Sequence, residues 1–279
     1  MAASPKPAER ASSEGLGRGF PSDRAALVVY LMAGYPDRPG SLAALHVVAD
    51  AGADVIELGV PYTDQLADGP VIVRASSDAR EAAGGSFGLA ETLELAREFV
   101  AGRPSRGTPC PPIALMTYLN PVIRLGFTSA ADAMANAGIA GVIIPDLPPD
   151  NPMTAEWLSA SRPRGLDTVF LVAPTSTPER MRTVAEASTG FVYCVSSVGI
   201  TGERTQLRDD LADVVARVKA KASVPVAVGF GVSTAEHAAH VAQMADGVVV
   251  GSAVVRRQAD LDELRAFVGE LASAVRATP

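Results

Sequence analysis

Short apolar runs alternate with longer amphipathic segments along almost the whole of this 279-residue chain, and this alternation constrains the fold more than any other feature. The apolar runs predict strands at 26–32, 54–58, 113–117, 141–144, 168–172, 191–195, 226–228 and 247–250. The segments between and after them predict helices at 41–50, 89–100, 129–137, 178–187, 207–222, 235–244 and 260–276. Strands that alternate with helices indicate βαβ units, so we expect a parallel sheet that is buried on both faces.

The number of these units predicts that the sheet closes on itself. Eight βα units in roughly 250 residues are typical of an α/β fold of the (β/α)8 TIM-barrel type. The alternative is an open, doubly wound sheet, whose dinucleotide-binding form carries Gly-x-Gly-x-x-Gly after the first strand. This chain has Gly-Tyr-Pro-Asp at 34–37 instead. The sequence therefore favours the barrel.

Composition sets the expected domain limits. Residues 1–22 are rich in Ala, Ser, Gly, Pro and charge without periodicity, and we interpret them as a disordered leader. Residues 23–279 are then expected to form a single TIM-barrel domain. The stretch 102–112 resembles a linker, but it lies between an expected helix and an expected strand. A surface loop is therefore the better interpretation than a domain boundary.

The charge and the cysteines limit the classes of partner and the compartment. The formal net charge is −7, which argues against a nucleic-acid-binding surface, and no block of Lys and Arg suggests an anionic membrane. Cys110 and Cys194 do not form a disulfide framework and are expected to be free thiols in a reducing compartment. Neither a signal peptide nor an apolar run long enough to span a bilayer is apparent. We therefore expect a soluble, cytoplasmic protein.

Three carboxylates lie at or after the end of the second expected strand, in the segment Glu-Leu-Gly-Val-Pro-Tyr-Thr-Asp-Gln-Leu-Ala-Asp-Gly-Pro at 57–70. Glu57 lies at the end of the strand, and Asp68 lies in a loop whose Gly and Pro residues give the backbone a defined shape. In a parallel barrel, catalytic groups sit at the carboxyl ends of the strands and in the loops beyond them. The alternative interpretation of this segment is a solvated acidic loop after a buried strand.

Glycines follow the last two expected strands. Gly-Phe-Gly at 229–231 and Gly251-Ser252 occupy the positions at which barrels bind the phosphate of a phosphorylated substrate. Glycine lets backbone N–H groups approach phosphate oxygens closely, although a single Gly-x-Gly is usually only a turn. After the sixth strand, small residues and glycines at 196–202 suit a loop that closes over a ligand, and a plain connector is the alternative.

The histidines do not indicate a metal site. His237 and His240 share one face of an expected helix, but helices lie outside a barrel and away from its catalytic loops. The chain shows no Ser-His-Asp arrangement, phosphate-binding P-loop or set of Cys and His ligands. Carboxylate chemistry on a small phosphorylated molecule is the interpretation that remains.

Several of these segments together resemble a known family, that of the tryptophan synthase alpha subunit. The resemblance rests on Glu-Leu-Gly-Val-Pro at 57–61, Leu-Ala-Asp-Gly-Pro at 66–70, Ala-Leu-Met-Thr-Tyr-Leu-Asn-Pro at 114–121, Ile-Ile-Pro-Asp-Leu-Pro-Pro at 143–149, Phe-Leu-Val-Ala-Pro-Thr-Ser at 170–176 and Gly-Ile-Thr-Gly at 199–202. It implies a TIM barrel that cleaves indole-3-glycerol phosphate to indole and glyceraldehyde 3-phosphate. It also implies no cofactor on this chain, and a beta-subunit partner that carries pyridoxal phosphate in an alpha2-beta2 tetramer.

The resemblance assigns roles by matching position. Glu57 would be the acid and base, and Asp68 would hold the indole N–H. Tyr193 would line the site, and Thr201 would bond Asp68 when the loop closes. The remaining matched residues would hold the phosphate through backbone N–H groups: Gly202, Phe230, Gly231, Gly251 and Ser252. A free-standing indole-3-glycerol-phosphate lyase that releases indole to another pathway shares this chemistry and is the alternative function. A barrel that serves mainly as an allosteric partner is disfavoured, because both carboxylates are present.

This chain also departs from the pattern that the resemblance leads us to expect. It reads Thr-Asp-Gln at 63–65, where Ser-Asp-Pro would be expected in a loop that commonly faces the beta subunit. Tyr30 and Tyr62 stand where phenylalanine is common, and the leader lacks an amphipathic helix that would cover the bottom of the barrel. None of these departures changes Glu57 or Asp68.

Overall fold

The computed structural model describes residues 15–65, 68–195, 211–229 and 231–278. Its strands are β1 (Ala26–Met32), β2 (Val55–Gly59), β3 (Ile113–Met116), β4 (Ile139–Ile143), β5 (Asp167–Val172), β6 (Val192–Val195), β7 (Val226–Gly229) and β8 (Gly247–Val250). Each strand pairs in parallel with the next, and β8 pairs with β1, so the sheet closes into a barrel. The prediction of a (β/α)8 barrel is therefore confirmed, and each of the expected strands is present.

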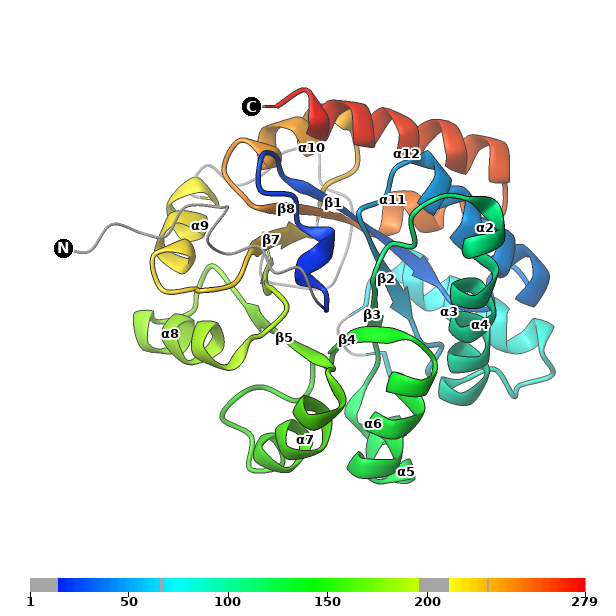
Figure 1. The fold of residues 1–279 in the computed structure, drawn as a ribbon, viewed down its shortest axis with the longest axis horizontal. Helices are drawn as coiled ribbons and strands as arrows, with labels where there is room; N and C mark the ends of the chain where they lie inside the picture. Colours follow the sequence, from blue (N-terminus) through cyan, green and yellow to red (C-terminus); the bar gives the residue numbers. More distant parts are fainter. Residues whose placement is uncertain (1–14, 66–67, 196–210, 230, 279) are drawn as a thin grey trace.

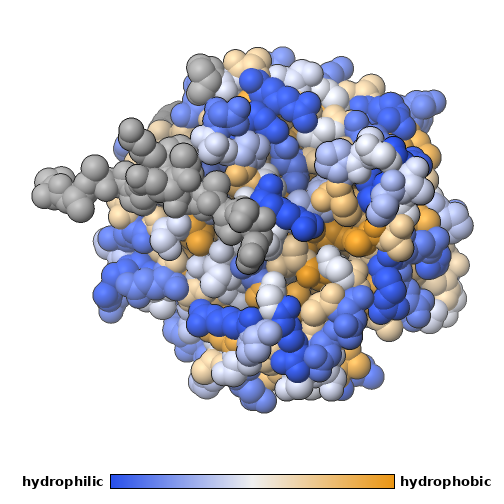
Figure 2. Space-filling model, viewed as in Figure 1, coloured by the Kyte–Doolittle hydropathy of each residue, from blue (hydrophilic) through white to orange (hydrophobic). Residues whose placement is uncertain are grey.

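Helices surround this barrel (Figure 1). They are α2 (Arg38–Ala51), α3 (Pro70–Ala82), α4 (Leu89–Gly102), α5 (Leu119–Leu125), α6 (Phe127–Asn136), α7 (Thr154–Ser161), α8 (Pro178–Ala187), α9 (Leu211–Lys219), α10 (Ala235–Ala242), α11 (Ser252–Val255) and α12 (Leu261–Arg276). The sequence analysis did not predict α3, α5, α7 or α11. In the described part of the chain, no helix is both long and apolar enough to cross a membrane. Figure 2 shows hydrophilic side chains over most of the rim and apolar side chains near the middle of the same face.

Two apolar cores lie on opposite sides of the sheet. One contains Leu27, Val29 and Leu31 of β1 and packs against the apolar faces of the helices. The other contains Ala26, Val28, Tyr30 and Met32 of the same strand and fills the barrel interior. Successive residues of a strand point to opposite faces, which explains this separation. Glu57 lies beside Tyr30 in the pairing of β1 with β2, and Tyr193 belongs to the interior core.

The bottom of the barrel is closed by the segment that precedes β1. A short 3-10 helix, η1 (Gly17–Gly19), lies across the middle of the ring of helices in Figure 1. Leu16 is completely buried, and its backbone N–H donates a hydrogen bond of 2.8 Å to the Asp167 carboxylate at the start of β5. The Phe20 ring lies 5.3 Å from that of Phe191. Residues 15–22 belong to the stretch expected to be a disordered leader, and here they are placed and partly packed; residues 1–14 lie outside the described residues.

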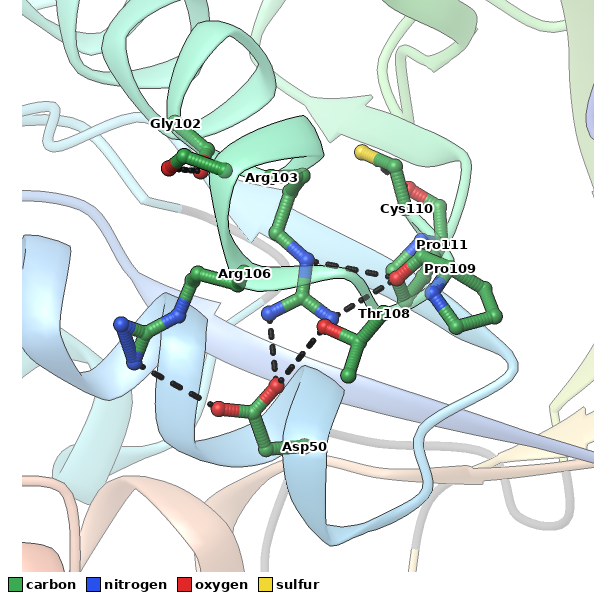
Figure 3. A network of polar contacts seen from close by, with 9 residues as sticks. Asp50, Gly102, Arg103, Arg106, Thr108, Pro109, Cys110 and Pro111 are labelled. Atoms are coloured by element: carbon green, nitrogen blue, oxygen red, sulfur yellow. Dashed lines mark hydrogen bonds and ion pairs between the residues drawn. The ribbon is translucent and has the colours of Figure 1, made fainter.

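The loop between α4 and β3 is held to the body of the barrel. Arg103 is 1% exposed, and its guanidinium lies 2.7 Å from the Asp50 carboxylate of α2 while also donating to the Pro109 carbonyl oxygen at 2.8 Å (Figure 3). Thr108 and Arg106 contact the same carboxylate. Burial acts to raise the pKa of Asp50, but its hydrogen bond to Arg103 and the nearby positive charges outweigh this and lower it. These contacts agree with a surface loop within one domain.

Candidate active site

Glu57 lies in the barrel interior, beside Tyr30. It is the third residue of β2, is 3% exposed, and its Oε2 atom has no hydrogen-bond partner among the described residues. Burial, with a smaller contribution from the charge of Asp68, raises the pKa of Glu57 from 4.5 to about 8. At neutral pH the side chain therefore carries a proton that no described protein group accepts. A buried neutral acid of this kind is suited to donate its proton to a ligand.

Asp68 lies in the loop between β2 and α3 and is 4% exposed. The loop ends at Gly69, and Pro70 is the first residue of α3, a position at which helices tolerate proline. The Tyr118 hydroxyl donates to Oδ2 of Asp68 at 2.8 Å, and the Gln65 side-chain amide donates to the same oxygen at 3.1 Å. Burial raises the pKa of Asp68, and these two hydrogen bonds act in the opposite direction. Two carboxylates therefore lie near each other in different environments, which gives them different capacities for acid–base chemistry.

Two tyrosines complete the wall beside the carboxylates, and each needs a glycine opposite it. A Cβ atom on Gly59 would lie 2.1 Å from the Tyr30 hydroxyl, and one on Gly229 would lie 2.4 Å from the Tyr193 hydroxyl. Burial, and then the charges of Glu57 and Asp68, raise the pKa of both tyrosines well above 10, so both hydroxyls keep their protons. Tyr193, which the sequence analysis assigned to substrate binding, lies on β6 and belongs to the interior core.

A second aromatic pair lies at the edge of this wall. The Tyr62 and Tyr118 rings are stacked with centroids 5.5 Å apart. The Asn120 amide of α5 donates a hydrogen bond of 2.8 Å to the Tyr62 hydroxyl. Through these contacts the β2–α3 loop is held against the residues that follow β3.

The glycine-containing segments after β7 and β8 lie at neighbouring strand ends, because these two strands pair in parallel. Gly231 has a φ of 87°, a conformation that favours glycine. Gly251 is the N-cap of α11, and Ser252 is its first residue. The first N–H groups of a helix have no acceptor within that helix, so they are available to an anion. Thr201, Gly202 and Phe230, which the sequence analysis assigned to substrate binding, lie outside the described residues.

The histidines lie away from the barrel mouth. His46 belongs to α2 and its ring lies 5.1 Å from that of Phe99, while His237 and His240 belong to the outer helix α10. Within residues 15–65, 68–195, 211–229 and 231–278, no cluster of three or more His, Cys, Asp and Glu side chains could hold a metal ion.

Sequence reasoning assigned no role to Tyr118 or to the Gln65 side chain, although both contact Asp68. Tyr118 follows β3 by two residues, and β3 pairs with β2. Its position at the carboxyl end of a neighbouring strand was the one sequence signal that could have indicated Tyr118 as a site residue.

Comparison with known proteins agrees with the resemblance stated above. A family model described as tryptophan synthase alpha chain matches residues 20–277. The tryptophan synthase alpha chain of Mycobacterium tuberculosis strain H37Rv is 45% identical over 273 residues, which are 96% of this chain and 97% of that protein. That of Mycobacterium avium strain 104 is 44% identical over 256 residues, covering 91% of this chain and 90% of the relative.

Solved structures give the same result. A structure of M. tuberculosis tryptophan synthase matches with a TM-score of 0.85 and 44% identity, over 95% of this chain and 99% of the matched chain. The tryptophan synthase alpha subunit of Legionella pneumophila strain Paris matches with a TM-score of 0.79 and 32% identity, over 91% and 93% of the two chains.

Proposed function

This chain belongs to the tryptophan synthase alpha chain family, and on that premise we propose that Glu57 and Asp68 are the two side chains that carry its reaction. The reaction is the cleavage of indole-3-glycerol phosphate to indole and glyceraldehyde 3-phosphate, a carbon–carbon lyase step in tryptophan biosynthesis. The observation that supports the proposal best is the unpartnered Oε2 of buried Glu57, with a pKa of about 8, beside Asp68.

In the proposed mechanism Glu57 acts first as an acid and then as a base. Its proton goes to C3 of the indole ring, which places positive charge on the ring nitrogen. The bond between C3 and the side-chain carbon then breaks, and its electron pair restores the aromatic ring. The hydroxyl on that carbon becomes the aldehyde of glyceraldehyde 3-phosphate and returns its proton to the Glu57 carboxylate. The proton count balances over the cycle, so the mechanism uses no external acid, base or cofactor.

Asp68 is proposed to remain ionised and to accept a hydrogen bond from the indole N–H. A fixed negative charge opposite that N–H stabilises the positive charge that develops when C3 is protonated. Because a water-filled site would screen this effect, the low exposure of both carboxylates favours the reaction. Tyr193 is proposed to contact the indole ring.

The phosphate is proposed to lie against backbone N–H groups of Gly231, Gly251 and Ser252, together with Gly202 and Phe230. Thr201 is proposed to bond Asp68 when the loop after β6 covers the substrate. The glycines after β7 and β8 support this placement, since they follow paired strands. We further propose that this chain has no cofactor of its own and works in the cytoplasm, within an alpha2-beta2 tetramer whose beta subunit carries pyridoxal phosphate.

Indole release from indole-3-glycerol phosphate, measured from pH 6 to pH 10, tests the proposed role of Glu57. Because the protonated form is the starting acid, the rate should be present below the pKa of Glu57 and lost as the pH rises through about 8. A rate that stays constant to pH 10 would exclude Glu57 as the acid. Repeating the assay with a beta subunit addresses the partner: faster release supports a beta-subunit partner, and no response supports a free-standing lyase.

A further inference from the structure

We propose that Gln65 is a positioning residue for this lyase, which holds the Asp68 carboxylate so that its Oδ1 atom faces the indole N–H of the substrate. The inference rests on the proposed function, because it assumes the role given above to Asp68. It adds a residue that the resemblance to the family did not assign.

The contacts of Asp68 carry the argument. Both hydrogen bonds that its carboxylate accepts from described residues, from the Tyr118 hydroxyl at 2.8 Å and from Nε2 of Gln65 at 3.1 Å, go to Oδ2. The backbone also connects the two residues, because the Asp68 N–H points to the Gln65 carbonyl oxygen at 3.5 Å. Among the described residues no donor to Oδ1 is present, so this oxygen is open to a ligand, and a carboxylate oxygen can accept a hydrogen bond from an indole N–H.

Two donors fix the carboxylate better than one. The terminal torsion of an Asp side chain has a broad energy minimum, so a single hydrogen bond leaves the plane of the carboxylate free to rotate. Tyr118 approaches from the segment that follows β3, whereas Gln65 belongs to the same loop as Asp68. With donors from two parts of the chain on one oxygen, the direction of the other oxygen is defined.

The amide also favours the ionised form of Asp68. Among the described residues, the titratable groups around this carboxylate are Glu57 on β2, Tyr30 on β1, Tyr193 on β6 and Tyr118 before α5. Burial raises the pKa of Asp68, while the hydrogen bonds from Tyr118 and Gln65 lower it. Gln65 carries no charge and does not titrate, so its contribution is constant across the pH range of the enzyme.

The test is the pH dependence of kcat in Gln65→Met, which keeps the length of the side chain and removes its donor. We expect kcat to fall about tenfold at pH 6–7, the value of one charge-assisted hydrogen bond. The acidic limb of the kcat profile should move up by about 0.5–1 pH unit, and KM should stay within about twofold because Gln65 does not bind substrate. Thr63→Val is the matched control, since exposed Thr63 lies in the same loop and its hydroxyl bonds Asp64, not Asp68.

A double-mutant cycle separates this inference from the proposed function. In an Asp68→Asn background, Gln65→Met should cause no further loss of kcat, because the two residues act through one carboxylate. If Asp68→Asn slows the reaction but Gln65→Met leaves kcat and its pH profile unchanged, the positioning role is wrong and the role of Asp68 stands. If Asp68→Asn itself leaves kcat unchanged, the proposed function fails first. A rise in KM with unchanged kcat in Gln65→Met would also overturn the inference, because it would make Gln65 a substrate-binding residue.

Discussion

Replacing Glu57 with Gln should make the protein more stable at alkaline pH, although the variant loses the proposed catalytic acid. The pKa of Glu57 is raised from 4.5 to about 8 by burial and by Asp68. Between these two values the folded protein keeps the proton while the unfolded chain has lost it. Below pH 4.5 both states are protonated, and this group does not lower the free energy of unfolding. As the pH rises from 4.5 to about 8 the free energy of unfolding falls progressively, and above about 8 the loss is complete.

The magnitude follows from the same shift. A rise of about 3.5 in pKa, at ~1.36 kcal/mol for each unit, corresponds to about 5 kcal/mol. The free energy of unfolding of Glu57→Gln should therefore exceed that of the wild-type chain by under ~1 kcal/mol at pH 5 and by about 5 kcal/mol at pH 9. All other titrating groups are shared by the two proteins, so most of their contribution cancels in this difference.

Urea unfolding followed by circular dichroism at pH 5, 7 and 9 gives the required free energies. Glu94→Gln is the control, because Glu94 is exposed on α4 and its replacement should give a difference that stays near zero at each pH. Where unfolding passes through an intermediate, hydrogen exchange of the β2 amides provides the same comparison. A difference between wild type and Glu57→Gln that stays constant from pH 5 to pH 9 would refute the raised pKa and the reasoning built on it.

Three further predictions concern the rest of the site. Asp68→Asn should lower kcat about 10²–10³-fold with little change in KM. The alkaline limb of the kcat profile should also move to lower pH, because the charge that helps to raise the pKa of Glu57 is gone. An effect on KM alone would contradict this prediction. Gly251→Asp should raise KM for the phosphorylated substrate at least about tenfold, because the carboxylate repels the phosphate. Ser252→Ala should change KM less than about twofold, since backbone N–H groups are the proposed phosphate ligands. A larger KM change in Ser252→Ala than in Gly251→Asp would exclude that phosphate site. Gly59→Ala should destabilise the fold by about 1–3 kcal/mol, since its Cβ atom would lie 2.1 Å from the Tyr30 hydroxyl and 2.6 Å from Cζ of the same ring. Tyr30→Phe in the same chain removes only the hydroxyl and should restore part of the loss in thermal unfolding; equal losses in both backgrounds would argue against the hydroxyl contact.

The barrel could be predicted from the sequence because its strands are apolar and its helices amphipathic. A strand that is buried on both faces needs a continuous apolar run, and those runs mark all the strands from β1 to β8. The helices that were missed are short, as with α5 and α7, or bury mainly small Ala and Ser side chains, as α3 does at positions 75, 76 and 79. Local pattern gives little evidence for elements of one or two turns, which tertiary packing stabilises.

The segment before β1 shows a different limit. Its Gly-rich composition indicates no regular structure, yet Leu16 and Phe20 fill the bottom of the barrel. The reason lies in distant residues: a side chain at Gly141 or Gly190 would collide with Leu16, and Asp167 binds its backbone N–H. Contacts of this kind depend on the closed barrel, so no local pattern in residues 15–20 could reveal them.

At the candidate site, the sequence pointed to the carboxylates but not to their partners. Glu57 and Asp68 were proposed because they lie at or after the end of a predicted strand and match the family pattern. Tyr118 is 50 residues from Asp68 along the chain, and the structure brings it within hydrogen-bonding distance. The side-chain bond of Gln65 depends on the turn of the loop, which residue types alone do not specify.

The most direct test of the proposed chemistry is a single-turnover measurement of indole formation by Glu57→Gln, with the dissociation constant of indole-3-glycerol phosphate measured on the same protein. The amide keeps the size and polarity of the side chain but has no proton to donate to C3. The rate should be ~10²–10⁴-fold below wild type, with a dissociation constant within about threefold of it. Indole formation at a rate near that of the wild-type chain would contradict the assignment of Glu57 as the acid and base.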